Sequence, residues 1–222
     1  MPHLPSQPAR VARRLPAATR QVLLELHVAD LGGVSHTQPG QYVAAGTPEG
    51  TGWFALVNPP GDPVELLVRD GDGAAGALYR AAPGTEFTLG GAQGFGFPLT
   101  GVRPGTPVLL VAGGTGIAPL VPLLGAVVER GAVATLLYGV RDRGGFALLE
   151  RLRGAHRTTL FVSRDVPEPP EVAGRVTDAL AGDALPWTGL VAFLSGPPGM
   201  VTAARDKLLA LGTRGDNVRV NF

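Results

Sequence analysis

The stretch VLLVAGGTGIAPL, residues 108–120, has the composition of a phosphate-binding turn. An apolar run leads directly into three glycines, Gly113, Gly114 and Gly116. Pro119 follows where the first turn of a helix tolerates a residue without an N–H group, and Thr115 adds a hydroxyl donor. Glycines let the backbone approach a ligand closely, and the free N–H groups at a helix start favour an anion. The same glycines could simply make a tight turn, so this stretch alone leaves nucleotide binding open.

A second turn of this kind is LSGPPGM, residues 194–200. Two adjacent prolines cannot extend a strand, so the chain must form an ordered turn after the apolar run 190–194. In open α/β sheets, ligands bind beyond the carboxyl ends of the strands. Two such turns in one sheet therefore predict the edge of a binding crevice.

The elements that position these turns change character near residue 103. Up to residue 102, short apolar segments are bounded by Gly, Pro or Asp, which predicts a small antiparallel β-barrel or sandwich. Beyond it, unbroken apolar runs alternate with helical stretches, which predicts a doubly wound α/β domain with a parallel sheet. We therefore expect two domains, a β-barrel over 1–102 and an α/β domain over 103–222.

The individual elements follow from the same patterns. Predicted strands of the barrel are 9–14, 21–27, 41–45, 53–57, 64–69 and 86–90, with one short helix at 74–80. Predicted strands of the α/β domain are 108–112, 135–138, 158–162, 190–194 and 218–220. Its predicted helical stretches are 119–130, 146–153, 175–181 and 200–211.

The composition argues against several classes of protein. The 222 residues carry 19 Lys and Arg against 18 Asp and Glu, so a net charge of +1 gives no support for a nucleic-acid partner. The absence of cysteine excludes disulfides, thiolate zinc sites and a cysteine-ligated iron–sulfur cluster within this chain. The four histidines are scattered without metal-ligand spacing, so we expect no metal site. The uncharged run 104–128 is broken by GGTG and two prolines, so we expect no membrane span and a soluble, cytoplasmic protein.

With these motifs in view, the sequence resembles the ferredoxin–NADP reductase superfamily, in which a flavin-binding β-barrel precedes a pyridine-nucleotide domain. The segments that carry the resemblance are PGQYV (39–43), GGAQGFGFPL (90–99), GGTGIAP (113–119), YGVR (138–141) and SGPPGM (195–200). The segment 90–99 is similar to one in the electron-transfer subunit of dihydroorotate dehydrogenase. That subunit carries a cysteine-ligated cluster, for which this chain has no ligands.

The chain departs from the family at the flavin site. The family's R-x-Y-S/T motif corresponds to Gly52-Trp53-Phe54-Ala55, continued through Leu56 and Asn58, so the arginine and the hydroxyl are both missing. The phosphate turn before the short helix runs from Gly73 to Gly76, with glycine where the family usually has serine. Each lost charge-assisted hydrogen bond costs about 1.5–3 kcal/mol, roughly ten- to a hundredfold in affinity.

Three interpretations of the barrel follow. It binds flavin, either FAD or FMN, with Trp53 or Phe54 as the stacking platform and the backbone N–H groups of 73–76 at the phosphate. Alternatively a partner chain supplies the missing charge, or the barrel has lost its flavin and kept its fold. We expect bound flavin because PGQYV and the loop 90–96 keep the family pattern. Trp53 and Phe54 could equally be a barrel strand that places one aromatic on each face.

For the nucleotide, the resemblance implies further residues. Ser195 stands where the family has a cysteine near the nicotinamide, and Phe222 would be the aromatic that the family often places against the flavin. The pair Ser163-Arg164 implies contact with a 2′-phosphate, which favours NADP over NAD, and Arg141 and Arg143 could contribute. Ser195 could instead be an ordinary turn residue, Ser163-Arg164 a solvated cluster, and Phe222 the last core residue of an edge strand.

We therefore assign Ser195 and Phe222 to the catalytic centre. The residues assigned to cofactor binding are Trp53, Phe54, Ala55, Leu56, Asn58, Gly73, Gly76, Gly113, Gly114, Thr115, Gly116, Pro119, Arg141, Ser163, Arg164, Gly196, Pro197 and Met200.

The sequence predicts an NAD(P)H-dependent flavoprotein oxidoreductase that passes electrons from the nicotinamide, through flavin, to a separate protein or small-molecule acceptor. The alternative is a flavin-free relative that binds nucleotide, or nothing, and acts as a sensor, scaffold or regulatory subunit. A third possibility is a flavin reductase that releases free reduced flavin.

Overall fold

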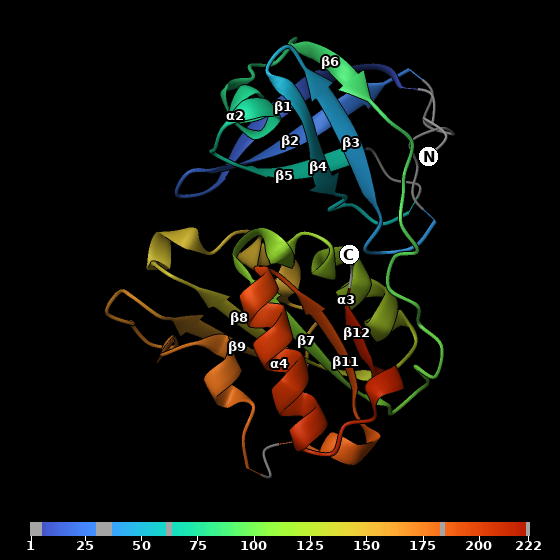
Figure 1. Cartoon of the computed structure of the whole chain (residues 1–222), viewed down its shortest axis with the longest axis vertical. Helices are drawn as coiled ribbons and strands as arrows, with labels where there is room; N and C mark the ends of the chain where they lie inside the picture. Colours follow the sequence, from blue (N-terminus) through green and yellow to red (C-terminus); the bar gives the residue numbers. More distant parts are fainter. Residues whose placement is uncertain (1–5, 30–36, 61–63, 183–184, 221–222) are drawn as a thin grey trace.

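The computed structural model describes residues 6–29, 37–60, 64–182 and 185–220, which form a β-barrel stacked on an α/β domain (Figure 1). The predicted two-domain fold class is confirmed. Among the helices of these described ranges, none combines the length and hydrophobicity that crossing a bilayer requires.

In the described part of the chain, six antiparallel strands form the barrel in the order β4-β3-β6-β1-β2-β5. Their bounds are β1 (Gln7–Ala18), β2 (Gln21–Val28), β3 (Tyr42–Thr47), β4 (Gly50–Ala55), β5 (Val64–Arg69) and β6 (Glu86–Leu89). A bridge between Leu56, directly after β4, and Leu66, within β5, joins the two edge strands and closes the sheet on itself. The helix α2 (Gly73–Arg80) packs against β3, β4 and β5.

The α/β domain contains a sheet whose six described strands are parallel, in the order β10-β9-β8-β7-β11-β12. Their bounds are β7 (Pro107–Gly113), β8 (Val133–Val140), β9 (Arg157–Val162), β10 (Val172–Ala173), β11 (Val191–Ser195) and β12 (Val218–Val220). The chain builds the sheet outward from β7 to β10 on one side and then from β11 to β12 on the other. The strand order therefore reverses between β7 and β11, which is where doubly wound sheets bind ligands.

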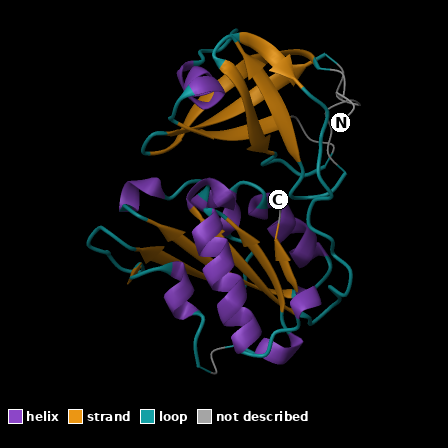
Figure 2. Cartoon of the chain, viewed as in Figure 1, coloured by secondary structure: helices purple, strands orange, loops and turns teal. Residues whose placement is uncertain are grey.

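Both faces of this sheet are covered, as Figure 2 shows. Leu110 of β7 belongs to the same apolar cluster as the buried side of α3 (Leu120–Glu129). Its neighbour Val111 belongs to the cluster that contains the buried side of α4 (Pro198–Ala210). Successive side chains of a strand point to opposite faces, so the unbroken apolar run 108–112 is required by helices on both sides.

Two predicted helical stretches are only single 3₁₀ turns in the structure. The stretch 146–153 contains one turn, Leu149–Leu152, and the stretch 175–181 contains another, Val176–Ala179. Leu148 adopts a φ of +59° directly before the first turn, which no continuous α-helix tolerates. After the second turn, the backbone of Leu180 leaves the helical region. The barrel strands β1 and β4 also differ from prediction, since they cover 7–18 and 50–55 rather than 9–14 and 53–57.

One apolar core spans the two domains. Leu23, Leu67 and Phe97 from the N-terminal half belong to the same buried cluster as Ile117 and Phe193 of the α/β domain. The rings of Phe97 and Phe193 meet edge to face, with centroids 5.5 Å apart. Burial of these apolar side chains contributes favourable free energy to the contact between the barrel and the sheet.

The linker 90–106 between β6 and β7 is fixed to the α/β domain by Arg219 of β12. Its guanidinium donates to the carbonyl oxygens of Pro98 and Thr100 and lies 5.3 Å from the centre of the Phe193 ring. Burial lowers the pKa of Arg219. The predicted domain boundary at 102/103 falls within this linker.

An ion pair between Arg151 and Glu65 also crosses the interface. The Nη1 and Nη2 atoms of Arg151 lie 2.5 and 2.9 Å from the two carboxylate oxygens of Glu65, in a bidentate arrangement. The hydrogen bond with Glu65 raises the pKa of Arg151. The pair therefore joins β5 of the barrel to the 3₁₀ turn that replaces the predicted helix.

We expect Arg151→Ala to lower the free energy of unfolding by about 1–3 kcal/mol, because it leaves the largely buried carboxylate of Glu65 without its partner. Urea unfolding followed by circular dichroism measures the change. Arg153→Ala removes an exposed arginine of the same segment and serves as the control. Equal stability of the two variants would contradict the assigned role of the pair.

Candidate active site

The two glycine-containing turns predicted from sequence meet at the point where the strand order reverses. Ala112 of β7 pairs with Ser195 of β11, so both strands end at the same edge of the sheet. A Cβ atom on Gly116 would lie 2.4 Å from the carbonyl oxygen of Ser195, and one on Gly196 would lie 2.9 Å from the nitrogen of Gly113. The turns therefore touch backbone to backbone, and glycine is required where they do.

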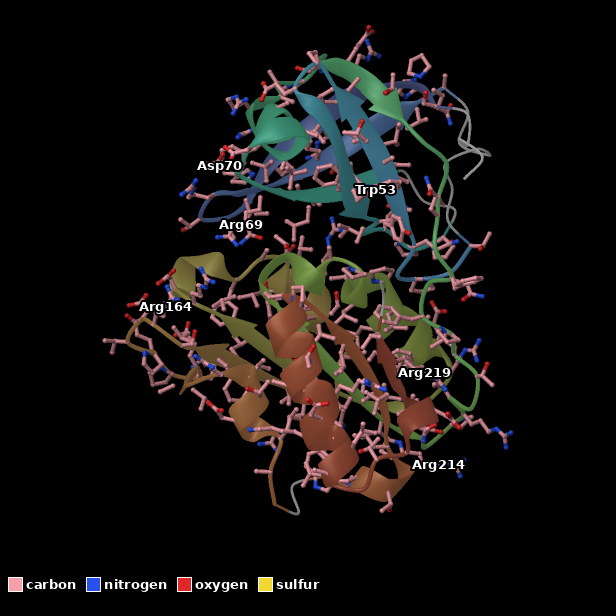
Figure 3. The ribbon with its side chains drawn as sticks, viewed as in Figure 1. Trp53, Arg69, Asp70, Arg164, Arg214 and Arg219 are labelled. Carbon is pink, nitrogen blue, oxygen red and sulfur yellow. The ribbon has the colours of Figure 1, made fainter. Side chains whose placement is uncertain are left out.

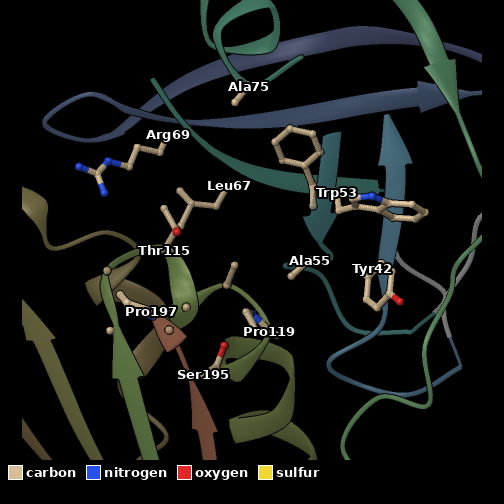
Figure 4. A pocket seen from close by; sticks show the side chains of 16 residues that line it. Tyr42, Trp53, Ala55, Leu67, Arg69, Ala75, Thr115, Pro119, Ser195 and Pro197 are labelled. Carbon is tan, nitrogen blue, oxygen red and sulfur yellow. The ribbon is translucent and has the colours of Figure 1, made fainter. Parts of the chain in front are cut away.

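Between these turns and the barrel lies a cavity of about 680 Å³, which we call the barrel cavity (Figure 4). The α/β domain contributes Gly113–Gly116, Ala118, Pro119 and Ser195–Pro197 to its wall. The barrel contributes Tyr42, Trp53, Phe54, Ala55, Leu67, Arg69 and Ala75. Its size is within the range of small-molecule sites.

The barrel side of this cavity is aromatic. Tyr42 and Trp53 meet edge to face with ring centroids 5.5 Å apart, and Trp53 is 60% exposed. Phe54 instead packs against the barrel core. Strand β4 thus places one aromatic on each of its faces, while both residues still border the cavity.

A second cavity of about 620 Å³, which we call the arginine cavity, is also bordered by the glycine turn. Its described lining includes five arginines and one carboxylate, that of Asp142. The arginines are Arg20, Arg69, Arg141, Arg164 and Arg175. Arg20 pairs with Asp70 at 3.0 Å, whereas the other four form no ion pair with a described residue. Unpaired guanidinium groups around one cavity favour an anionic ligand.

The two cavities join at the glycine turn. Gly113, Gly114, Thr115, Pro197 and Arg69 border both of them. Figure 3 shows Arg69 on the barrel and Arg164 on the α/β domain at the same side of the molecule. The arrangement suits an elongated ligand with phosphate groups at its middle and at one end, and an uncharged ring at the other end.

Comparisons with known proteins agree with this geometry. Residues 110–206 match the family model of the oxidoreductase NAD-binding domain. The chain is 29% identical over 177 residues to the electron transfer subunit of dihydroorotate dehydrogenase B (NAD(+)) from Shouchella clausii, covering 75% of this chain and 65% of that protein. It matches the crystal structure of the Amycolatopsis cytochrome P450 reductase GcoB with a TM-score of 0.85 at 25% identity, over 99% of this chain and 70% of that one. Residues 110–206 thus form an oxidoreductase NAD-binding domain, and the chain as a whole resembles proteins of the ferredoxin–NADP reductase superfamily.

The predicted resemblance is thus confirmed. A ferredoxin NADP⁺ reductase from Neisseria gonorrhoeae, determined with bound FAD and NADP, shares the fold with a TM-score of 0.81 at 18% identity, over 98% of this chain and 99% of that one. The chain spans 65% of the dihydroorotate dehydrogenase subunit and about half of most other curated relatives that it matches.

Most of the predicted site residues border the two cavities of this reductase-family fold. Those at the barrel cavity are Trp53, Phe54, Ala55, Gly113, Gly114, Thr115, Gly116, Pro119, Ser195, Gly196 and Pro197. Those at the arginine cavity include Arg141, Ser163, Arg164 and Met200. The hydroxyl of Ser163 donates to the carbonyl oxygen of Val140 at 3.2 Å, so it also closes the turn after β9.

Four predicted residues border neither cavity, and one lies outside the described residues. Leu56 is fully buried, and Asn58 accepts a hydrogen bond from the backbone N–H of Glu65 at 2.9 Å, so both serve the closure of the barrel. Gly73 and Gly76 shape the start of α2, where Ala75 instead reaches the cavity. Phe222, predicted against the flavin, lies outside the described residues.

The sequence patterns missed four residues that the structure brings to the cavities: Tyr42, Arg69, Arg20 and Arg175. Tyr42 lies in PGQYV, a segment that the resemblance itself singled out. Arg69 ends a strand that was predicted with the correct bounds. Its position at both cavities depends on how the barrel docks, which no local pattern reveals. Arg175 follows the two-residue strand β10, whose pattern is too short to detect.

We expect Gly116→Ala to destabilise the protein by about 1–3 kcal/mol and to weaken nucleotide binding, because the new methyl group would push the two turns apart. Gly125→Ala in α3 is the matched control, since its Cβ would meet no described atom within 4 Å outside its own helix. Chemical unfolding and calorimetric titration with NADP⁺ measure both effects. An unchanged affinity in Gly116→Ala would contradict the importance of this contact.

Proposed function

We propose that this protein is an NAD(P)H-dependent oxidoreductase in which a reduced nicotinamide passes hydride to a flavin ring in the barrel cavity. The observation that carries the proposal is the junction of an aromatic-lined cavity and an arginine-lined cavity at one glycine turn. Its relatives include electron transfer and reductase components, which supports the general role. The electrons then leave for a separate acceptor, either a protein or a small molecule.

The nucleotide would lie across the junction of the two cavities. Its diphosphate would meet the backbone N–H groups of the glycine turn and the guanidinium of Arg69, which border both cavities. The nicotinamide would then enter the barrel cavity beside Ser195 and Pro119, and the adenosine would extend into the arginine cavity. This orientation follows from charge, because the described lining of the barrel cavity contains one charged side chain and that of the arginine cavity contains six.

The flavin, when bound, supplies the redox chemistry. The chain's own residues orient the two rings and exclude water. Tyr42 and Arg69 are the titratable groups among the described residues of the barrel cavity, so no carboxylate or histidine is at hand for proton transfer. Ser195 can donate a hydrogen bond to the nicotinamide, and the apolar side chains of Leu67 and Pro119 limit the room for water.

We propose NADP as the preferred nucleotide. Ser163 and Arg164 follow β9, and Arg141 follows β8, so these strands bring them to one edge of the arginine cavity together with Arg175. Guanidinium groups bind a phosphate monoester with charge-assisted, bidentate hydrogen bonds. Arg143 contributes nothing here because it is ion-paired with Glu168 and Glu171.

The test is the oxidation of NADPH under anaerobic conditions, with and without added flavin, followed at 340 nm. We expect oxidation that requires flavin and saturates with NADPH. A protein that binds NADP⁺ but oxidises no NADPH with riboflavin, FMN or FAD would overturn the proposal. That result would favour the flavin-free module, for which the missing arginine and hydroxyl on β4 are the support.

We expect Arg164→Ala to weaken NADP⁺ binding by about ten- to a hundredfold and to leave NAD⁺ binding nearly unchanged, because only NADP⁺ carries the 2′-phosphate. Arg69→Ala should weaken both nucleotides to a similar extent, because both carry the diphosphate. Calorimetric titration of each variant with NADP⁺ and NAD⁺ measures the difference. Arg157→Ala, at the opposite end of β9, is the control. Equal losses for both nucleotides in Arg164→Ala would contradict the assignment.

A further inference from the structure

The space for a flavin-binding cation on β4 is closed in this protein. A Cβ atom on Gly52 would lie 2.9 Å from Cε2 of Phe54 and 3.1 Å from the Cβ atom of Ala74. The ring of Phe54 and the helix α2 therefore occupy the room into which a longer side chain at position 52 would extend. An arginine cannot stand there unless Phe54 or α2 moves.

The start of α2 is unsuited to a phosphate. Asp72 directly precedes its first residue, is exposed and makes no capping hydrogen bond. Carboxylates at a helix N-terminus are themselves stabilised by the helix dipole, so they oppose a second anion there. Ala75, in the first turn, presents only a methyl group to the barrel cavity. Gly76 packs so closely on the segment before the helix that its Cβ would lie 2.2 Å from the carbonyl oxygen of Gly71.

Among the described residues, the arginines near α2 already have other partners or point elsewhere, and Arg14 donates to the carbonyl oxygen of Tyr79 in the last turn of the helix. Arg80 binds both carboxylate oxygens of Glu49 at 2.7 and 2.8 Å, and Arg20 pairs with Asp70 at 3.0 Å. Arg69 is the one charged side chain among the described residues that line the barrel cavity. Figure 4 shows Arg69 extending away from Ala75 and Trp53. Its guanidinium is therefore placed for the nucleotide that shares its two cavities and not for a phosphate at α2.

The same cavity remains well suited to a flat, uncharged ring system. Tyr42, Trp53 and Leu67 form its barrel wall, and Thr115 and Ser195 offer hydroxyl groups from the opposite wall. Aromatic and aliphatic walls with a few placed polar groups are typical of sites for planar ligands. The exposure of Trp53, at 60%, leaves the aromatic wall accessible from solvent.

We propose that the barrel cavity recognises the isoalloxazine ring of flavin and makes no use of the phosphate tail, so that flavin enters and leaves as a diffusible co-substrate. This inference rests on the proposed function, since it assumes hydride transfer from NAD(P)H. The separate acceptor is then oxidised flavin itself. The reduced flavin carries both electrons away from the protein.

The reaction balances without any further redox group. Hydride leaves C4 of the reduced nicotinamide, where a C–H bond breaks, and forms an N–H bond at N5 of the oxidised flavin. One proton from water neutralises the flavin at N1. The nicotinamide is oxidised by two electrons, the flavin is reduced by two electrons, and both products dissociate.

The first experiment compares three flavins that share the ring and differ in the tail. Riboflavin, FMN and FAD are titrated into the full chain, with quenching of flavin fluorescence as the readout. We expect dissociation constants within about tenfold of one another, and protein that loses its yellow colour on gel filtration. FAD binding more than a hundredfold tighter than riboflavin, or stoichiometric FAD that survives purification, would overturn the inference.

Variants test separately the carboxylate before α2 and the filled space beside Gly52. Asp72→Asn removes the carboxylate before α2 and should improve FMN and FAD binding by about two- to fivefold while riboflavin stays unchanged. Asp206→Asn, on the exposed side of α4, is the matched control. The double variant Gly52→Arg/Phe54→Ala opens the filled space and adds a guanidinium, so we expect at least a tenfold gain for FAD over riboflavin. The wild-type protein could instead prefer FAD to riboflavin. If neither Asp72→Asn nor the double variant changed that preference, the result would contradict the roles assigned to Asp72 and to the filled space beside Gly52.

Failure of the inference and failure of the proposed function give different results. If NADPH is oxidised only by protein loaded with tightly bound FAD, the proposed function holds and the inference is wrong. If none of the three flavins binds or supports NADPH oxidation, both are wrong. Multiple turnovers with free riboflavin, at rates similar to those with FMN and FAD, support both.

Discussion

The contact on which the site depends is the backbone packing of two turns at the reversal of the strand order. Gly116 lies against the carbonyl of Ser195, and Gly196 lies against Gly113, so the ends of β7 and β11 form one surface. Any side chain at these points would separate the turns. This surface borders both cavities. The close packing of the two turns therefore fixes the distance between the aromatic wall of the barrel cavity and the arginines of the arginine cavity.

Two sets of arginines have different roles in this structure. Arg20, Arg80, Arg143 and Arg151 are ion-paired and hold segments or domains together, and Arg219 anchors the linker through carbonyl groups. Among the described residues of the arginine cavity, Arg69, Arg141, Arg164 and Arg175 form no ion pair and surround the proposed position of the nucleotide. The near-neutral net charge of the chain therefore does not reveal this cationic cavity, because a total charge carries no information on where four unpaired arginines lie close together.

The fold class and the two turns could be predicted from sequence because each depends on residues that are close together in the chain. The apolar run at 108–112, the glycines after it and the paired prolines after Ser195 each specify their own backbone, so both turns and the fold class were predicted correctly. The helix expected at 146–153 failed because Leu148 takes a positive φ, which its apolar pattern does not reveal. Arg69 and Arg20 reach the arginine cavity only through the docking of the barrel, and no pattern within one segment encodes that docking.

The β1–β2 hairpin carries a consequence for how such proteins can be recombined. The backbone N–H of Thr19 donates to the carbonyl of Gly144 at 2.6 Å, and Gln21 donates to that of Gly145 at 3.0 Å. A Cβ on Gly144 would meet the Thr19 hydroxyl at 2.2 Å. The hairpin thus supplies part of the wall of the arginine cavity, where we propose that the nucleotide lies. Joining this α/β half to a different barrel would therefore change the wall of the arginine cavity, unless the new barrel carried a matching β1–β2 turn.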